Sequence, residues 1–140
     1  MKKVFLDTNV IIDVLDQREK FFIESSNILS LGAEGKLELY ATSLTFTTCV
    51  YVLRKSLGYT KIIESIRLLR TFIHISPISE PEFDLAFAKD VPDVEDMLQY
   101  YSAVSAGCDV VITRNEKHFP TNGIPIMTPY NFLRQYKGVL

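Results

Sequence analysis

The sequence has little cysteine and little histidine, with two of each among its 140 residues. Cys49 and Cys108 are far apart and lie among apolar neighbours, and together with His74 and His118 they form no zinc-ligand spacing. This scarcity argues against a tetrahedral zinc centre and against a disulfide framework. We expect both cysteines to be small buried hydrophobic residues.

Long hydrophobic runs are also missing. No segment approaches the roughly 18 uninterrupted apolar residues of a membrane helix. The first apolar run is broken by Asp7 too early for a signal peptide. We therefore expect a single cytoplasmic domain, residues 1–140, with no membrane partner and enough chain to bury a core.

A strong excess of one charge is absent as well, since the net charge is −2 and the pI is about 5.7. The protein is thus not a generic nucleic-acid binder. The charge is unevenly spread, however. Residues 54–70 carry a net charge of +4 and residues 80–96 a net charge of −6. The first stretch is suited to phosphates and the second to cations, although each also fits a solvated helix face.

The first polar break in the chain follows a short apolar run, residues 4–6. An unbroken run of this length fits a strand that is buried on both faces, as in a parallel sheet. Asp7 would then lie at the carboxyl end of a central strand, where open α/β sheets bind ligands. The alternative is that Asp7 and Asn9 cap the next helix or form an Asx turn.

Strand patterns alternate with helical patterns along the whole chain. The expected strands are residues 4–6, 37–42, 71–75, 109–113 and 124–126. The expected helices are residues 10–15, 22–32, 44–56, a helix opening at Thr60, 81–89, 93–106 and 129–136, with a short turn or helix at 115–119. This order predicts an α/β fold, a three-layer α/β/α sandwich around a parallel sheet of about five strands.

Polar residues gather at three strand ends or helix starts where a core does not need them: Asp7 to Asn9, Asp93 to Asp96, and Thr113 to Glu116. Strands one and four can be neighbours in such a sheet, so these segments would meet. Carboxylates that are drawn together repel, and Mg²⁺ or Mn²⁺ would relieve that repulsion. A metal ion held there could activate a water and neutralise a phosphodiester.

Each acid near the long helix also has a plainer interpretation. Asp93 is equally suited to be the helix N-cap, and Glu95 would point away from Asp96 and favour the helix dipole. Asp96 precedes an apolar stripe and would face the crevice, which makes it the better ligand. Asp109 fits a strand entry rather than a ligand.

With these three segments, in this order and spacing, the sequence resembles the PIN domain family, and within it the VapC-like toxin ribonucleases. The segments are residues 4–12, residues 93–103 and residues 108–119. The resemblance implies an α/β/α sandwich, Mg²⁺ or Mn²⁺ in an acidic cleft, hydrolysis of single-stranded RNA, and often a homodimer that an antitoxin protein neutralises.

Position by position, Asp7 matches the first acid of the family and Asp96 matches its helix acid. The second acid, usually a glutamate, corresponds to Thr48. The fourth corresponds to Asn115, and the acid that often follows three residues later corresponds to His118. Two of the four expected carboxylates are therefore neutral here.

The resemblance implies metal ligation by Asp7 and Asp96 with help from the amide oxygen of Asn115. Supporting positions, some acting through water, are Asp93, Glu95, Glu116, Thr8, Asn9 and Thr113. The expected contacts to RNA phosphates are Arg54, Lys55, Arg114 and Lys117. A dimer surface formed by Tyr51, Phe72, Tyr100 and Tyr101 competes with core roles for these aromatic residues.

Three functions remain open from the sequence. The leading hypothesis is a metal-dependent endoribonuclease that acts on single-stranded RNA, with the toxin of a toxin–antitoxin pair as its expected role. The second is a degenerate PIN module that binds RNA or a protein without cleavage, which Thr48 and Asn115 favour. The third is a haloacid-dehalogenase-type phosphatase with Asp7 as nucleophile, which ranks low because Asn9 replaces the acid that this chemistry generally needs.

Overall fold

The first strand, β1 (Lys3–Leu6), runs through the centre of the protein. The structure is a computed structural model, and it describes residues 1–136. Val4 and Leu6 pack into one hydrophobic cluster and Phe5 packs into a second, and all three side chains are fully buried. Alternate residues of a strand point to opposite faces, so an apolar run without polar interruption is what a doubly covered strand requires.

Within residues 1–136 the sheet has five strands in the order β3-β2-β1-β4-β5, all parallel. The other strands are β2 (Glu38–Thr42), β3 (Ile73–Ser76), β4 (Val110–Ile112) and β5 (Ile126–Met127). Phe5 of β1 lies opposite Tyr40 of β2 and opposite Val111 of β4. The predicted parallel α/β sheet is confirmed.

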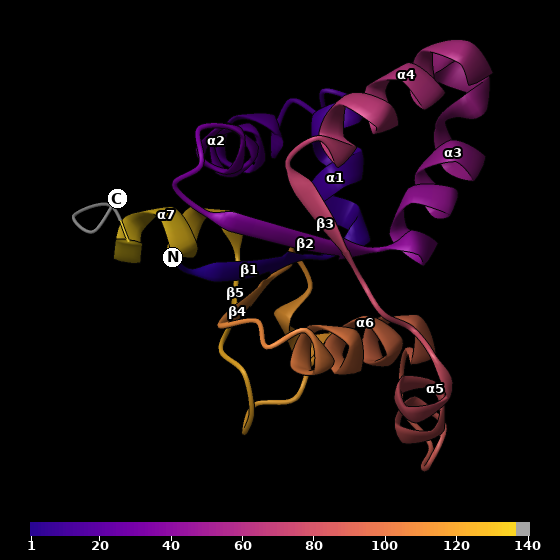
Figure 1. The fold of residues 1–140 in the computed structure, drawn as a ribbon, viewed down its shortest axis with the longest axis vertical. Helices are drawn as coiled ribbons and strands as arrows, with labels where there is room; N and C mark the ends of the chain where they lie inside the picture. The colour runs from indigo at the N-terminus through magenta and orange to yellow at the C-terminus, as the bar shows by residue number, and fades with distance from the viewer. Residues whose placement is uncertain (137–140) are drawn as a thin grey trace.

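Helices connect the strands and cover both faces of the sheet. They are α1 (Thr8–Leu15), α2 (Phe22–Ala33), α3 (Ser43–Leu57), α4 (Tyr59–Arg70), α5 (Glu80–Ala86), α6 (Val94–Ser105) and α7 (Pro129–Tyr136), with a short 3₁₀ helix η1 (Glu116–His118). In Figure 1, α1 to α4 lie on one side of the sheet and α5 and α6 lie on the other, which gives the three layers expected from the sequence.

Several predicted ends were wrong. The helix expected over residues 81–89 ends at Ala86, and the strand expected from residue 71 begins at Ile73, because Thr71 caps α4. The last strand is Ile126–Met127 rather than 124–126. Pro125 has no N–H to donate, and only its carbonyl contributes, by accepting the N–H of Val111 at 3.0 Å.

The chain order places a topological switch point between β1 and β4. From β1 the chain proceeds through β2 to β3 on one side, and it then returns to add β4 and β5 on the other side. The carboxyl ends of β1 and β4 therefore open into a crevice of the kind in which α/β sheets bind ligands. Among residues 1–136, no helix is long and apolar enough to cross a membrane.

Candidate functional site

Asp7 follows β1 and is held beside β4 by a backbone hydrogen bond from its N–H to the carbonyl of Ile112 at 2.9 Å. Its side chain is 2% exposed. One carboxylate oxygen accepts the backbone N–H of Thr8 at 2.7 Å, and the other accepts the Thr113 hydroxyl at 2.7 Å and the Asn9 side-chain amide at 3.0 Å. Thr8, Asn9 and Thr113 thus fix the orientation of this carboxylate.

Asp7 is also the N-cap of α1, so the capping interpretation is confirmed. This role does not exclude a ligand role, because a carboxylate oxygen has two lone pairs. Burial raises the pKa of Asp7, and the nearby charge of Asp93 acts in the same direction. A buried carboxylate held at the switch point is costly to ionise unless a cation approaches it.

The amino end of α6 brings the other acids to the same crevice. Asp93 is the N-cap of α6, as one interpretation of the sequence predicted, and its Oδ1 accepts the N–H of Asp96 at 3.1 Å. Asp96 is 8% exposed, and its Oδ2 lies 2.8 Å from Nδ1 of His118 in η1. Ligand atoms of Asp93, Asp96 and His118 all lie within 4.8 Å of one another.

These acids influence each other electrostatically. Burial and the charges of Asp7 and Asp93 raise the pKa of Asp96 to about 6, against the opposing contact with His118. Burial and the charges of Asp93 and Asp7 also raise the pKa of Glu95. We call Asp7, Asp93, Glu95 and Asp96 the acid cluster. Glu95 lies in the first turn of α6, where its charge favours the helix dipole, and it is half-buried within reach of the charges of Asp93 and Asp7.

The two neutral positions are both near the crevice but differ in their surroundings. Thr48 lies on α3 and is half-buried, whereas Asn115 is exposed at the start of η1. The Asn115 N–H donates to the Thr113 hydroxyl at 3.0 Å, and its carbonyl accepts the N–H of His118 at 3.0 Å. Asn115 therefore shapes the turn that carries His118 to Asp96. Glu116 is exposed on that turn.

Thr45 and Gln99 form a buried polar network behind Asp7 that the sequence reasoning missed. The Gln99 side-chain oxygen accepts the Thr8 N–H at 3.2 Å and lies 3.4 Å from the Thr45 hydroxyl. The hydroxyls of Thr8 and Thr45 are 3.0 Å apart. Gln99 lies three residues after Asp96, on the same face of α6, which was the available signal. The network joins α1, α3 and α6 at the crevice.

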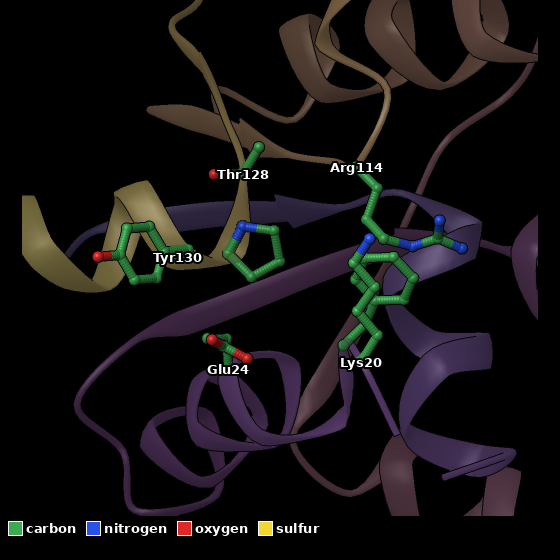
Figure 2. Close-up of a pocket in the computed structure, with 7 residues that line it drawn as sticks. Lys20, Glu24, Arg114, Thr128 and Tyr130 are labelled. Carbon is green, nitrogen blue, oxygen red and sulfur yellow. The ribbon is translucent and has the colours of Figure 1, made fainter. Parts of the chain in front are cut away.

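The pairing of Asp13 with Arg114 was also missed. The fully buried Asp13 carboxylate accepts Nε of Arg114 at 2.6 Å and Nη2 at 3.2 Å. The Arg114 guanidinium lies 4.1 Å from the ring centre of Phe21. Figure 2 shows Arg114 and Lys20 at one side of a pocket of about 290 Å³, with Thr128 and Tyr130 at the other. Arg114, expected to contact phosphate, is paired with a protein carboxylate while its side chain is 23% exposed, and the phosphate contact stays a prediction.

The remaining basic residues lie in two places. Lys117 lines a hollow of about 520 Å³ together with Lys89, Tyr101 and His118, so this hollow adjoins the acid cluster. Arg54 and Lys55 lie in the last turn of α3, roughly 16 Å along the helix axis from its start at the crevice. Figure 1 shows α3 and α4 extending away from the sheet as a hairpin, with these residues near its far end.

Only part of the acidic stretch 80–96 reaches the crevice. Glu82 accepts hydrogen bonds from the Ser79 N–H and hydroxyl, both at 2.7 Å, and from the Ser105 hydroxyl at 2.8 Å. The hydrogen bonds from Ser79 hold the pKa of Glu82 at about 2. Glu80, Asp84 and Asp90 are exposed outside the cluster. The stretch is thus partly a metal-site candidate and partly a solvated helix face.

The donor atoms at the crevice fit a divalent cation. Carboxylate oxygens with an adjacent imidazole are ordinary ligands of such ions, and the raised pKa values mark negative charge that a cation would stabilise. Within the acid cluster, Asp7 and Asp96 have the least solvent access. We assign them as the principal candidates to hold an ion, with Asp93, Glu95 and His118 around them.

Comparisons with known proteins agree with this fold. A family model described as PIN domain matches residues 3–117. Ribonuclease VapC1 of Aquifex aeolicus is 31% identical over 143 residues, covering 96% of this chain and 96% of that protein.

Solved structures show the same architecture. DNA-bound VapBC from Salmonella typhimurium gives a TM-score of 0.67 at 21% identity, covering 92% of this chain and 99% of that chain. VapBC-1 from nontypeable Haemophilus influenzae gives a TM-score of 0.64 at 19% identity, covering 91% and 98%. Since the family model spans most of the sequence and the relative aligns along nearly all of it, the chain belongs to the PIN domain family.

Proposed function

We propose that this protein is a metal-dependent endoribonuclease that acts on single-stranded RNA, and that it is the toxin of a toxin–antitoxin pair. The observation that carries the proposal is the acid cluster, whose buried carboxylates have raised pKa values at the switch point of the sheet. The relationship to Ribonuclease VapC1 along nearly the whole chain supports the same chemistry.

The cofactor of this proposal is Mg²⁺ or Mn²⁺, held by Asp7 and Asp96 with Asn115 assisting. Asp93, Glu95 and Glu116 would support the ion through water. When bound, the ion would supply an activated water and positive charge for the phosphodiester. Thr113, Asn9 and Thr8 present the Asp7 carboxylate in a fixed orientation, so little reorganisation is needed when the ion and the RNA arrive.

The hollow beside the cluster is the best candidate for the RNA chain. Lys89 and Lys117 provide positive charge in it, and Tyr101 provides an aromatic surface on which a base can stack. One end of the hollow is His118, which contacts Asp96. Arg54 and Lys55 are too far along α3 to share this hollow, and we propose them as contacts for a longer RNA.

A protein partner is supported by apolar side chains exposed on the α3–α4 hairpin, which are Tyr51, Val52, Tyr59 and Leu68. Apolar side chains that are exposed on one protruding element are candidates for an interaction surface. The solved neighbours are VapBC complexes, and we propose an antitoxin as the partner here. For a homodimer surface Tyr51 remains available, whereas Tyr100 is 6% exposed and belongs to the core.

A second candidate is a PIN module that binds RNA without cleavage. Thr48 and Asn115 favour it, because two fewer carboxylates hold a cation less strongly and stabilise less charge. The phosphatase hypothesis loses support for two reasons. The Asn9 side-chain amide donates a hydrogen bond to the Asp7 carboxylate, and the chain belongs to the PIN domain family.

The test is cleavage of a single-stranded RNA by the purified protein with Mn²⁺ or Mg²⁺. Cleavage should stop with a chelator and should fall by about 100-fold or more in Asp7→Asn, because a principal ligand loses its charge. Cleavage that survives Asp7→Asn would mean a contaminant or a different site. RNA binding without cleavage by the native protein would favour the second candidate.

A further inference from the structure

His118 is the only nitrogen donor near the acid cluster among the described residues, and its placement depends on the fold around η1. The N–H of His118 bonds to the Asn115 carbonyl at 3.0 Å, and the next residue, Phe119, is buried in the core under α6. These contacts direct the imidazole toward α6, where Nδ1 lies 2.8 Å from Oδ2 of Asp96.

We propose that His118 is a direct ligand of the metal ion, and that its nitrogen makes the site prefer Mn²⁺ and later transition ions over Mg²⁺. This inference rests on the proposed metal-dependent function. The juxtaposition that carries it is the set of donor atoms of Asp93, Asp96 and His118 within 4.8 Å of one another. With 43% of its side chain exposed, His118 can turn slightly without disturbing the core.

The chemistry of the donor set gives the direction of the preference. Mg²⁺ binds oxygen, requires near-ideal octahedral geometry and gives up its waters reluctantly. Imidazole suits transition ions, whose affinity for such ligands rises from Mn²⁺ towards Cu²⁺. Replacing an oxygen donor by an imidazole nitrogen therefore weakens the site for Mg²⁺ relative to Mn²⁺. The ring would bind as neutral imidazole, with its proton on the other nitrogen.

The chain contains a matched control in its other histidine. His74 lies exposed on β3, where its ring stacks on Tyr40 at 5.1 Å and its Nε2 is 3.9 Å from Glu38. It belongs to no cluster of three candidate ligands among the described residues. If surface histidines bound Mn²⁺ without a specific site, His74→Ala would reduce the binding of Mn²⁺ to histidine as much as His118→Ala does.

The experiment is pulsed electron paramagnetic resonance of the protein loaded with Mn²⁺, in which directly bound imidazole gives ¹⁴N modulation of the spin echo. The native protein and His74→Ala should show the modulation, and His118→Ala should lose it. Calorimetric titration of the same proteins with Mn²⁺ and Mg²⁺ supplies the second readout. His118→Asp should lower the ratio of Mn²⁺ to Mg²⁺ affinity by about tenfold or more.

The outcomes separate this inference from the proposed function. Mn²⁺ binding without ¹⁴N modulation, or with modulation unchanged in His118→Ala, would overturn the inference even if RNA is still cleaved. Modulation that depends on His118 in a protein that cleaves no RNA would support the inference and overturn the nuclease proposal. Failure to bind Mn²⁺ at all would overturn both. Circular dichroism of each variant confirms that it is folded.

Discussion

At the scale of single residues, the acid cluster combines structural and chemical roles in the same side chains. Asp7 and Asp93 each cap a helix, and both lie where their charges raise the pKa of Asp96. The Asp7 carboxylate accepts one hydrogen bond at Oδ1 and two at Oδ2, which leaves one lone pair of Oδ1 for a cation. The Asp93 Oδ1 accepts the N–H of Asp96, and its other oxygen is left for a cation. Capping therefore fixes the orientation of Asp7 and Asp93 and still leaves each carboxylate able to bind a cation.

The raised pKa of Asp96 predicts how pH changes the stability of the metal-free protein. The pKa rises from 3.8 to about 6, so the folded state binds this proton more tightly than the unfolded state. The stabilisation is complete below about pH 4 and is lost as the pH rises through 6. Asp96→Asn should remove this loss and raise the free energy of unfolding at pH 7 by on the order of 2 kcal/mol.

The measurement is urea unfolding with a chelator present, at several pH values between about 5 and 7. Glu82 does not contribute to the change in stability over this pH range. Its pKa is lowered to about 2, so the stabilisation that it provides is lost only as the pH falls below about 4.5. Equal stability of native protein and Asp96→Asn at pH 7 would show that Asp96 is not held in an unfavourable charged state.

Asp93 allows its two roles to be separated. Asp93→Ser removes the carboxylate but retains a side-chain oxygen for the N–H of Asp96, whereas Asp93→Ala removes both. Asp93→Ala should be less stable than Asp93→Ser by about 1 kcal/mol, the usual contribution of an N-cap. Both should weaken Mn²⁺ binding alike in calorimetric titration. Native affinity in Asp93→Ser would exclude Asp93 from the metal site.

The sequence was sufficient to predict that Asp7, Asp93 and Asp96 lie at one crevice of the sheet, because each follows a strand or begins a helix. Their role as metal ligands stays a prediction. Thr45 and Gln99 could not be predicted in the same way. Their hydrogen bonds join α1, α3 and α6, and which side chains meet across three helices depends on packing rather than on local pattern. The half-burial of Glu95 could not be predicted either, because it depends on the elements that pack around the start of α6.

At the scale of elements, the loop after β4 is fastened to α1 by the buried pair of Asp13 and Arg114. The carboxylate receives two hydrogen bonds from the guanidinium, and the Arg114 N–H lies 3.4 Å from the Asn9 side-chain oxygen. This loop also contains Thr113, which holds Asp7, and it leads into η1 with His118. The pair is therefore a positioning device for the crevice.

Breaking this pair should destabilise the protein strongly. Arg114→Ala should lower the free energy of unfolding by about 3 kcal/mol, since the fully buried Asp13 carboxylate loses its main partner. Asp13→Ala should lower it by less, because the Arg114 side chain is 23% exposed and can be hydrated. In the double variant Asp13→Ala with Arg114→Ala, the free energy of unfolding should fall by less than the sum of the two single effects. The difference, which is the coupling energy of the pair, should be about 2 kcal/mol. Denaturant unfolding of the native protein, the two single variants and the double variant measures this coupling as a double-mutant cycle.

A surface ion pair on the same segment provides the control. Asp16 accepts Nε of Arg18 at 3.2 Å, and both side chains are partly exposed. Asp16→Ala should change the free energy of unfolding by less than about 0.5 kcal/mol. If Asp13→Ala and Asp16→Ala had equal effects, the buried pair would not fasten the loop to α1.

Most elements were predictable from periodicity and end signals. The N-cap expected at Asp93 for α6 is present. Thr42 caps α3, and Thr128 accepts the N–H of Asn131 at 3.1 Å at the start of α7. The ends that were wrong are those without a strong local signal. The chain leaves α5 at Phe87 with no glycine to mark the end, and Lys89 was included in the helix for that reason.

At the scale of the whole molecule, the order of strands decides where chemistry can occur. Because β4 returns to pair with β1, Asp7 and Thr113 meet although they are 106 residues apart in sequence. The two hydrophobic clusters on either face of the sheet hold this arrangement, and Phe5 and Val4 divide β1 between them. Alternation of strands and helices predicts the layers and allows β1 and β4 to be neighbours, but the full strand order depends on packing across the sheet.

The measurement that tests the account most directly is the rate of single-stranded RNA cleavage at increasing Mn²⁺ concentration, for the native protein beside Thr48→Glu with Asn115→Asp. The account predicts that the native protein cleaves RNA in a metal-dependent manner, because Asp7, Asp96 and their neighbours suffice to hold the ion. The double variant should need less Mn²⁺, since it adds two carboxylates. Cleavage by the double variant alone, with none by the native protein at any Mn²⁺ concentration, would contradict the account.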